Sequence, residues 1–372
     1  MKKIIYITNN LTVGGVTEVV KQTTKELIDR YNISIISLSN DISGWNDCNI
    51  PVKIFDIEIN LGYKLRNYFS DTFINKKIEH NYKPIIDYII KENPELIHFH
   101  TLPRFLKIGL LIKKQINTEL VFTDHLVRIS NKEYNFLAQK GLALVYRYLY
   151  KNYHLIFVSK QVEQVAKQYK FISKNKVNIK INNGIDITKY SLINKKEDAV
   201  IFIYIARISP VKGHKELINA WKKLKTKKKI ELWLIGPNEM GNEIEKLISN
   251  NNTIKLLGSR NDIPELLSKA DIGIFPSKKE GLPLSLLEKM ASGLPVIVSN
   301  IRELTDIIED NKDGLVYSLE NENDLIEKIN ILLKDKELCQ YLGNNARKKI
   351  ENEFSIINVI NQLDIFYKKI LS

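Results

Sequence analysis

Short runs of apolar, mostly β-branched residues alternate along the chain with longer segments in which apolar residues recur every three or four positions. The first run, at 3–8, is followed by a glycine-containing loop and an amphipathic segment at 16–30. The pattern predicts further strands at 33–38, 52–57, 96–100, 120–123 and 155–158, and helices near 80–91, 104–115 and 133–151. This order of elements is typical of parallel βαβ units.

A polar, turn-rich segment at 182–198 (NNGIDITKYSLINKKED) interrupts the alternation and predicts a linker. The alternation then restarts, with strands predicted at 199–205, 231–235, 253–257, 271–275, 295–298 and 314–317. The length of 372 residues agrees with two domains at roughly 150 residues each. We therefore expect two Rossmann-like, doubly wound α/β domains, with a ligand site in a cleft between them beyond the carboxyl ends of the strands.

Charge is the feature of the composition that changes this picture. Hydrophobic residues make up 44% and charged residues 27% of the chain, as in ordinary globular proteins. The formal net charge is +13, and residues 101–190 carry most of it, with 16 Lys+Arg against 5 Asp+Glu. Tyr146, Tyr148, Tyr150 and Tyr153 lie among the lysines and arginines of this basic segment. It is either a solvated helix face or a surface that contacts anionic lipid headgroups.

Nucleic acid is not an expected partner, because no DNA- or RNA-binding signature accompanies the charge. The two cysteines, Cys48 and Cys339, lie in opposite halves, which argues against a disulfide framework and favours a reducing compartment. No apolar run approaches the roughly 18 residues of a membrane-spanning helix, and the run after Lys3 is too short for a signal peptide. We therefore expect a cytoplasmic protein that can touch the inner face of the cell membrane.

Two loops at predicted strand ends carry candidate anion-binding residues. The loop after the first strand (NNLTVGG) places Gly14 and Gly15 just before a helix, whose free N–H groups attract anions, although glycine pairs are also common turn formers. In the second half, a strand ends in ARISPVKG, with Arg207 and Lys212 near the next helix start. These cations are either exposed loop residues or partners of a diphosphate.

The segment 276–293 (PSKKEGLPLSLLEKMASG) is the most informative part of the sequence. Pro283 suits the first position of a helix that we expect from about 283 to 291. Glu280 then lies in the loop before this helix and Glu288 within it, and the amides of Leu284 and Ser285 are free to bind an anion. Taken singly, the two glutamates could equally be a helix-dipole carboxylate and a solvated residue.

The Glu-x7-Glu spacing of Glu280 and Glu288, followed by Gly293-Leu294-Pro295-Val296, resembles the donor-site signature of retaining glycosyltransferases of the GT-B fold, family 4 (glycosyl transferases group 1). Other motifs agree in order, namely Gly14-Gly15, Asn183-Gly184-Ile185-Asp186, Arg207 with Lys212, Gly258, and Asp313-Gly314. The resemblance implies an N-terminal acceptor-binding domain at 1–185, a linker at 186–198 and a C-terminal nucleotide-sugar-binding domain at 199–353. It also implies a C-terminal helix, within 354–372, that crosses back to the first domain.

The resemblance also implies roles for individual residues. Glu288 holds the ribose of a nucleotide sugar, Glu280 contacts the donor sugar, and Arg207 and Lys212 offset charge on the leaving diphosphate. His125 follows a strand and faces the donor sugar, with His98 and His100 as weaker candidates. The remaining implied donor-binding residues are Gly14, Gly15, Arg260, Gly281, Leu282, Leu284 and Ser285. No cofactor or metal is expected, since the chain has no Asp-x-Asp motif.

Three positions depart from the family pattern. Ala206 replaces a frequent glycine, Pro283 removes a backbone N–H that many members direct at the donor, and Lys289 replaces a frequent alanine. The expected function is transfer of a sugar from a UDP-sugar, or next a GDP-sugar, to a glycan or lipid-linked acceptor of bacterial cell-surface polysaccharide, with acceptor contacts near 60–73. The alternatives are a catalytically silent GT-B subunit that binds a partner or glycan, and a sugar-nucleotide epimerase.

Overall fold

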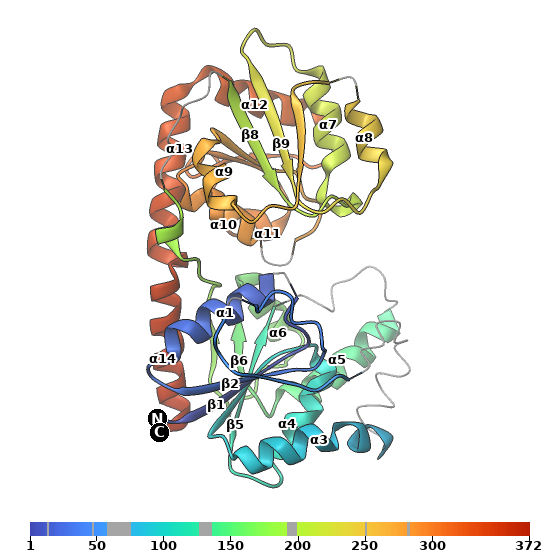
Figure 1. The fold of residues 1–372 in the computed structure, drawn as a ribbon, viewed down its shortest axis with the longest axis vertical. Helices are drawn as coiled ribbons and strands as arrows, with labels where there is room; N and C mark the ends of the chain where they lie inside the picture. Colours follow the sequence, from blue (N-terminus) through green and yellow to red (C-terminus); the bar gives the residue numbers. More distant parts are fainter. Residues whose placement is uncertain are drawn as a thin grey trace. The chain divides into compact units, whose positions relative to one another are not determined.

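The structure is a computed structural model that describes residues 1–12, 15–46, 48–57, 76–125, 136–191, 199–249, 251–280 and 283–372. The chain divides into two compact units. The first contains Met1–Asn183 and Val359–Ser372, and the second contains Gly184–Asn358. Each unit is a parallel sheet covered by helices, which is the doubly wound architecture that the alternating pattern predicts (Figure 1).

The sheet of the first unit has seven parallel strands, in the order β3-β2-β1-β4-β5-β6-β7. They are β1 (Lys3–Thr8), β2 (Asn32–Ser37), β3 (Val52–Ile54), β4 (Leu96–His100), β5 (Glu119–Asp124), β6 (His154–Phe157) and β7 (Asn178–Lys180). The first six lie at the apolar runs. β7 was not predicted, because its three residues are polar or half-exposed and it gains its order from pairing with β6.

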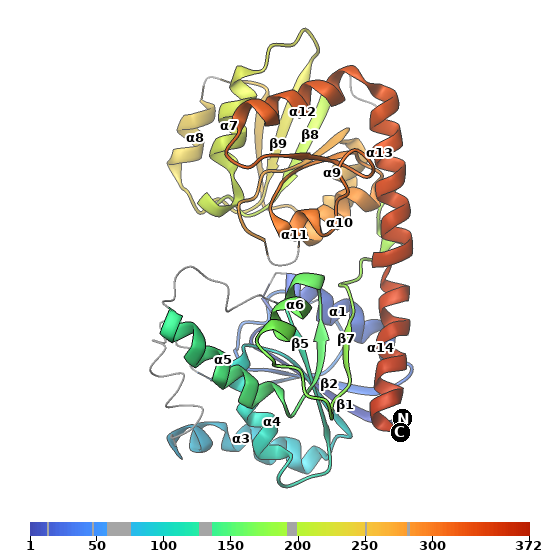
Figure 2. The same cartoon turned by 180° about the vertical axis from the view of Figure 1, so that it is seen from behind.

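The described residues of the first unit form, wholly or mainly, the helices α1 (Gly15–Leu27), α3 (Lys76–Glu92), α4 (Leu106–Ile112), α5 (Phe136–Tyr150), α6 (Lys160–Gln168) and α14 (Ile356–Leu371). A 3₁₀ turn at Pro103–Phe105 precedes α4. The start of α6 is fixed by Ser159, whose hydroxyl accepts a hydrogen bond from the Val162 amide. The C-terminal helix α14 lies against this sheet (Figures 1 and 2), held by the ion pair of Arg30 with Asp364 and by the hydrogen bond between Tyr6 and Tyr367.

The sheet of the second unit has six parallel strands, in the order β10-β9-β8-β11-β12-β13. They are β8 (Val200–Ile205), β9 (Ile230–Ile235), β10 (Ile254–Gly258), β11 (Ile272–Phe275), β12 (Val296–Ser299) and β13 (Leu315–Tyr317). The helices are α7 (His214–Lys223), α8 (Asn242–Ile248), α9 (Ile263–Lys269), α10 (Leu284–Ala291), α11 (Arg302–Thr305), α12 (Glu322–Lys334) and α13 (Lys336–Lys349). Short turns of 3₁₀ helix at Ile187–Lys189 and Pro210–Lys212 and a π-helix at Ile350–Phe354 complete the unit.

In both sheets the strand order reverses beside the first strand of the unit. The reversal falls between β1 and β4 in the first sheet and between β8 and β11 in the second. Loops that leave the carboxyl ends of such neighbouring strands diverge to opposite faces of the sheet, and ligands of doubly wound folds bind at that point. His100 ends β4, and Gly15, Lys212 and Glu280 follow β1, β8 and β11, whereas His125 follows β5 and Arg260 follows β10.

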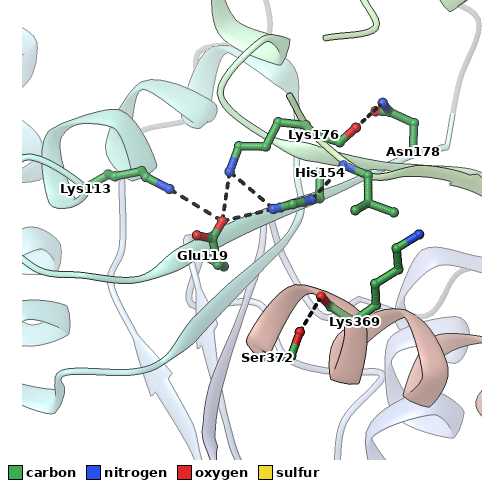
Figure 3. Close-up of polar contacts among 8 residues, drawn as sticks. Lys113, Glu119, His154, Lys176, Asn178, Lys369 and Ser372 are labelled. Carbon is green, nitrogen blue, oxygen red and sulfur yellow. Dashed lines mark hydrogen bonds and ion pairs between the residues drawn. The ribbon is translucent and has the colours of Figure 1, made fainter. Parts of the chain in front are cut away.

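The opposite, amino-terminal edge of the first sheet holds a cluster of charges (Figure 3). Glu119, the first residue of β5, accepts from Lys176 at 2.8 Å and pairs with Lys113 at 3.5 Å and with Nε2 of His154 at 2.9 Å. The Val177 amide donates to Nδ1 of His154 at 3.0 Å, so the imidazole carries its proton on Nε2 and donates to Glu119. Part of the positive charge of the basic segment 101–190 therefore forms ion pairs at the amino-terminal ends of these strands.

The tyrosines of the basic segment are mostly core residues. Tyr146, Tyr150 and Tyr153 are buried, and only Tyr148 is exposed, with the Lys151 ammonium over its ring. The interpretation of this segment as an aromatic surface is therefore wrong for Tyr146, Tyr150 and Tyr153. Tyr146 and Tyr150 are four residues apart on one face of α5, the spacing of a buried helix face, and Tyr153 follows the helix and donates to the Leu106 carbonyl oxygen.

Candidate active site

The second unit brings the Lys212 and Glu280 side chains together at the carboxyl ends of two neighbouring strands. Lys212 follows β8 and Glu280 follows β11, and these strands pair directly. The Lys212 ammonium lies 2.7 Å from both oxygens of the Glu280 carboxylate. The Glu280 side chain is only 5% exposed and that of Lys212 is 20% exposed, so this ion pair is screened little by solvent.

Main-chain geometry fixes the position of Lys212. Gly213 follows it with φ of 71°, a backbone conformation that favours glycine, and a Cβ there would lie 2.1 Å from the Pro276 carbonyl oxygen. The buried Tyr204 hydroxyl donates to the Lys212 carbonyl oxygen at 2.7 Å and lies 3.0 Å from the Ser277 hydroxyl. These contacts join the loop after β8 to the loop after β11.

Helix α10 carries Glu288 and begins at Leu284. Pro283 is the residue before the helix, with φ of −83° and ψ of 68°, and not the first helical residue as its sequence position suggested. Its carbonyl oxygen accepts from the amides of Leu286 and Leu287, which leaves the amides of Leu284 and Ser285 without helical partners. The Ser285 hydroxyl donates to the Ile205 carbonyl oxygen at 2.8 Å and so fastens the helix to β8.

Glu288 lies one turn along α10 from Ser285, and its carboxylate accepts a hydrogen bond from the hydroxyl of Tyr190 at 3.1 Å. Tyr190 itself is buried, and its carbonyl oxygen accepts from Arg347 of α13 at 2.9 Å. The sequence does not indicate Tyr190, because it lies in the turn-rich segment and only the fold places it beside α10. The one local signal is the Asn-Gly-Ile-Asp motif at 183–186, which ends directly before the 3₁₀ turn that leads to Tyr190.

The two arginines expected at this site lie apart from the two glutamates. The Arg207 side chain is 61% exposed and pairs with Glu239 at 3.2 Å. Arg260 is also exposed, and its Nε donates to Asp262 at 2.8 Å. Within the described residues, neither arginine forms a hydrogen bond or ion pair with Glu280 or Glu288.

Several expected site residues lie outside the described residues, namely Gly14, Gly281, Leu282 and the segment 60–73. Gly15 is described and is the exposed first residue of α1. Over the described ranges, no helix is long and apolar enough to cross a bilayer. The same ranges contain no group of three or more His, Cys, Asp and Glu side chains that could hold a metal ion.

In the first unit, His125 follows β5 and contacts a histidine of the neighbouring strand β4. His100 Nδ1 lies 3.0 Å from His125 Nε2, and both side chains are buried. His98, two residues earlier on the same face of β4, is held by Thr123 at 2.7 Å and by the hydroxyl of Tyr367 on α14. Of the two histidines that seemed weaker candidates, His100 contacts His125, and His98 packs against His100 at 4.2 Å between ring centres.

Burial lowers the pKa values of His98 and His100 well below their usual range, so both imidazoles are neutral at pH 7. A neutral imidazole has one donor and one acceptor nitrogen. Among the described residues, the buried Nε2 of His100 has no hydrogen-bond partner, and a proton there would be an unsatisfied donor. The proton of His100 is therefore placed on Nδ1, which donates to Nε2 of His125.

Two family models cover nearly the whole chain in succession. The first half, residues 13–189, matches the model described as Glycosyltransferase Family 4, and the second half, residues 188–349, matches the model described as Glycosyl transferases group 1.

Individual proteins agree with these matches. A protein of Escherichia coli named UDP-Gal:alpha-D-GlcNAc-diphosphoundecaprenol alpha-1,3-galactosyltransferase is 27% identical over 303 residues, covering 74% of this chain and 76% of its own. The N-acetyl-alpha-D-glucosaminyl L-malate synthase of Bacillus anthracis is 24% identical and covers 100% of this chain and 98% of its own.

Among solved structures, that of Anabaena Alr3699/HepE in complex with UDP shares the fold, with a TM-score of 0.81, 18% identity, and coverage of 99% of this chain and 100% of that one. Both units thus have the architecture of GT-B glycosyltransferases. Two successive family models, the curated relatives and this fold agree, and the chain belongs to the GT-B glycosyltransferases, with a Family 4 first half and a group 1 second half.

Proposed function

We propose that this glycosyltransferase moves a sugar from a nucleotide-sugar donor, a UDP-sugar before a GDP-sugar, to a glycan or lipid-linked acceptor of a bacterial cell-surface polysaccharide. We further propose that the anomeric configuration of the sugar is retained. The relative from E. coli is named for a UDP-galactose donor and a diphosphoundecaprenol-linked acceptor, and the Anabaena neighbour was solved with UDP. The relative from B. anthracis is named for an L-malate product, so small acceptors are to be compared with lipid-linked ones.

The observation that carries the proposal is the grouping of Lys212, Glu280 and Glu288 at the carboxyl ends of β8 and β11. An ionised carboxylate on α10 can accept both hydroxyl hydrogens of a ribose, a role proposed for Glu288. The unpaired amides at the start of α10 can bind the diphosphate. Lys212 then offsets the charge that develops on the leaving group, and Glu280 contacts the donor sugar.

The proposed step breaks the bond between the anomeric carbon and the oxygen of the distal phosphate. The acceptor oxygen bonds to the anomeric carbon on the same face, and its proton passes to the leaving phosphate oxygen. His125, which receives a hydrogen bond from His100, is proposed to contact the donor sugar. Arg207 is proposed to leave Glu239 and bind the diphosphate instead, since the Arg207–Glu239 ion pair is exposed and exposed ion pairs are weak. Neither a metal nor a cofactor is part of the proposal.

The test is a screen of UDP-, GDP- and ADP-sugars for slow hydrolysis by the full chain, with release of the nucleoside diphosphate as the readout. We expect release from one UDP-sugar. Glu288→Ala should lower the rate by about 100-fold or more and weaken donor binding, because the ribose loses its acceptor. Glu327→Ala, on the exposed face of α12, is the matched control and should change neither.

Product analysis separates the finer parts of the proposal. NMR spectroscopy of the transferred sugar reports the anomeric configuration, and inversion would refute retention. Lipid-diphosphate-linked sugars and L-malate serve as competing acceptors. A chain that binds and hydrolyses no nucleotide sugar would instead be a catalytically silent member of the fold.

A further inference from the structure

Lys289 is a completely buried lysine in the helix that carries Glu288. Its side chain has no exposed area, and its stem crosses Gly273 of β11, where an added Cβ would lie 2.7 Å from Lys289 Cδ. The ammonium donates to the Ser285 carbonyl oxygen at 3.0 Å. It also lies 5.0 Å from the ring centre of Phe275 and 5.9 Å from that of Tyr204. Lysine is almost never buried this completely without a carboxylate partner.

The charged groups around Lys289 are those of the donor site. Glu288 and Glu280 both favour its ammonium form electrostatically, and Glu280 is already paired with Lys212. The Tyr204 ring also contacts His214, at 4.6 Å between ring centres. Burial lowers the pKa of His214 to about 4, so it adds no charge at pH 7. Two carboxylates therefore face two lysines, and the group is neutral only when Lys289 is protonated.

The stem of Lys289 directs its ammonium toward the amino-terminal turn of α10, because helical side chains point back along the helix. This is the turn whose free amides are proposed to bind the diphosphate. We propose that Lys289 is a positioning residue of the donor site, whose buried positive charge offsets Glu288 and so allows the site to accept the anionic diphosphate of the nucleotide sugar. The inference rests on the proposed function, and it assigns a role to a residue at which the chain departs from its family.

A consequence of the burial is that this charge changes near neutral pH. Burial lowers the pKa of Lys289 to about 7, against the opposing effect of the two glutamates. A bound diphosphate adds negative charge and stabilises the ammonium. Above pH 7, donor binding must therefore be accompanied by proton uptake, and donor affinity must fall as the pH rises.

The experiment is calorimetric titration of the full chain with UDP between pH 7 and pH 8.5. The terminal phosphate of UDP is largely ionised over this range, since phosphates lose their second proton near pH 6. We expect binding to be roughly fivefold weaker at pH 8.5 than at pH 7, for a charge effect of this size at an intermediate effective dielectric constant. Titrations in two buffers of different ionisation enthalpy should show uptake of a fraction of a proton.

Lys289→Met keeps the length and the apolar stem but removes the charge. It should bind UDP with a weak affinity that is the same at both pH values, and with no proton uptake. Lys222→Met removes a lysine charge from the exposed end of α7 in the same unit and should behave like the unchanged chain.

Each outcome decides the inference. Equal UDP affinity at pH 7 and pH 8.5 in the unchanged chain would overturn it, and so would the same pH dependence and proton uptake in Lys289→Met. Should Lys289→Met fail to fold, the proton uptake of the unchanged chain is decisive by itself. If the unchanged chain binds no UDP, GDP or ADP at any pH, the proposed function fails and the inference fails with it. UDP binding that does not depend on pH overturns the inference alone, so the two failures can be told apart.

Discussion

The carboxyl-terminal edges of the two sheets present opposite chemistry on the same architecture. In the first unit this edge carries two neutral, buried imidazoles, His98 hydrogen-bonded to Thr123 and His100 hydrogen-bonded to His125. Its one buried carboxylate among the described strand ends, Asp124, accepts a hydrogen bond from the Tyr150 hydroxyl at 3.0 Å. In the second unit the corresponding edge carries charges, the Lys212–Glu280 pair and the buried ammonium of Lys289. The first edge can direct a hydrogen bond at a sugar hydroxyl, whereas the second can offset the charge of a diphosphate.

The difference teaches that the basic composition of a segment does not tell where the charged side chains of the candidate site lie. The first unit contains the strongly basic segment 101–190, yet the charged cluster of this segment that binds Glu119 is at the amino-terminal edge of the sheet (Figure 3). The second half, where Lys+Arg and Asp+Glu nearly balance, holds the charged candidate site. Four experiments can break or sharpen this contrast.

The largest effect is expected from Lys212→Met, which removes the cation of the charged edge. Turnover should fall by about 1,000-fold, because the proposed diphosphate site loses a cation. The free energy of unfolding should fall by about 3 kcal/mol, because Glu280 is left buried and unpaired. Steady-state kinetics and denaturant unfolding measure the two effects. In the double variant Lys212→Met/Glu280→Gln, stability should return but turnover should not, and recovered turnover would contradict the assigned role.

Lys289→Met should stabilise the protein without its ligand. The folded-state pKa of Lys289 is about 7, against 10.5 as its ordinary value, so the unfolded chain binds the extra proton between these values. Stability of the unchanged chain should therefore increase as the pH rises from 7 to 10, relative to Lys289→Met. At pH 6 the variant should be more stable by on the order of 3 kcal/mol, measured by urea unfolding. A variant that is less stable at pH 6 would show that the ammonium is not costly.

Glu119→Gln tests the charged cluster at the amino-terminal edge of the first sheet. Hydrogen bonds from Lys176 and His154 help hold the pKa of Glu119 at about 2, against 4.5 as its ordinary value. The stability it contributes is therefore present above about pH 4.5 and is lost as the pH falls toward 2. Because Glu119 is partly exposed, we expect a loss of only about 1–2 kcal/mol at pH 7, with unchanged turnover. A change in donor or acceptor KM would show that this edge is functional.

The smallest effect is expected from His100→Phe, at the neutral edge. The ring is replaced without a new charge, but His125 loses the donor that fixes its orientation. The catalytic rate should fall by about tenfold with an unchanged KM for the donor, because orientation and not affinity is lost. His100→Asn, which can still donate to His125, should recover part of the rate. An increase in donor KM alone would place this histidine pair in ground-state binding instead.

Much of the fold could be predicted from periodicity, because fully buried parallel strands such as IGIF in β11 read as continuous apolar runs. Six of seven strands in the first unit and all six in the second lie where those runs predict them. β7 could not be predicted, since a three-residue, half-exposed strand has no apolar signal. The spacing of Glu280 and Glu288 also predicted that the first precedes α10 and the second lies within it. Their partners could not be predicted, because they are distant in sequence: Lys212 is 68 residues from Glu280 and Tyr190 is 98 residues from Glu288.

The sequence by itself determined the alternation of strands and helices, the order of the motifs and the residue types available for chemistry. Only the tertiary structure decided which charges are paired, buried or exposed. It turned three tyrosines of the basic segment into core residues, placed His100 beneath His125, and enclosed Lys289 beneath α10. The physical reason is that periodicity records which face of an element is buried, whereas the protonation and partners of a buried polar group depend on neighbours that the fold brings from elsewhere in the chain.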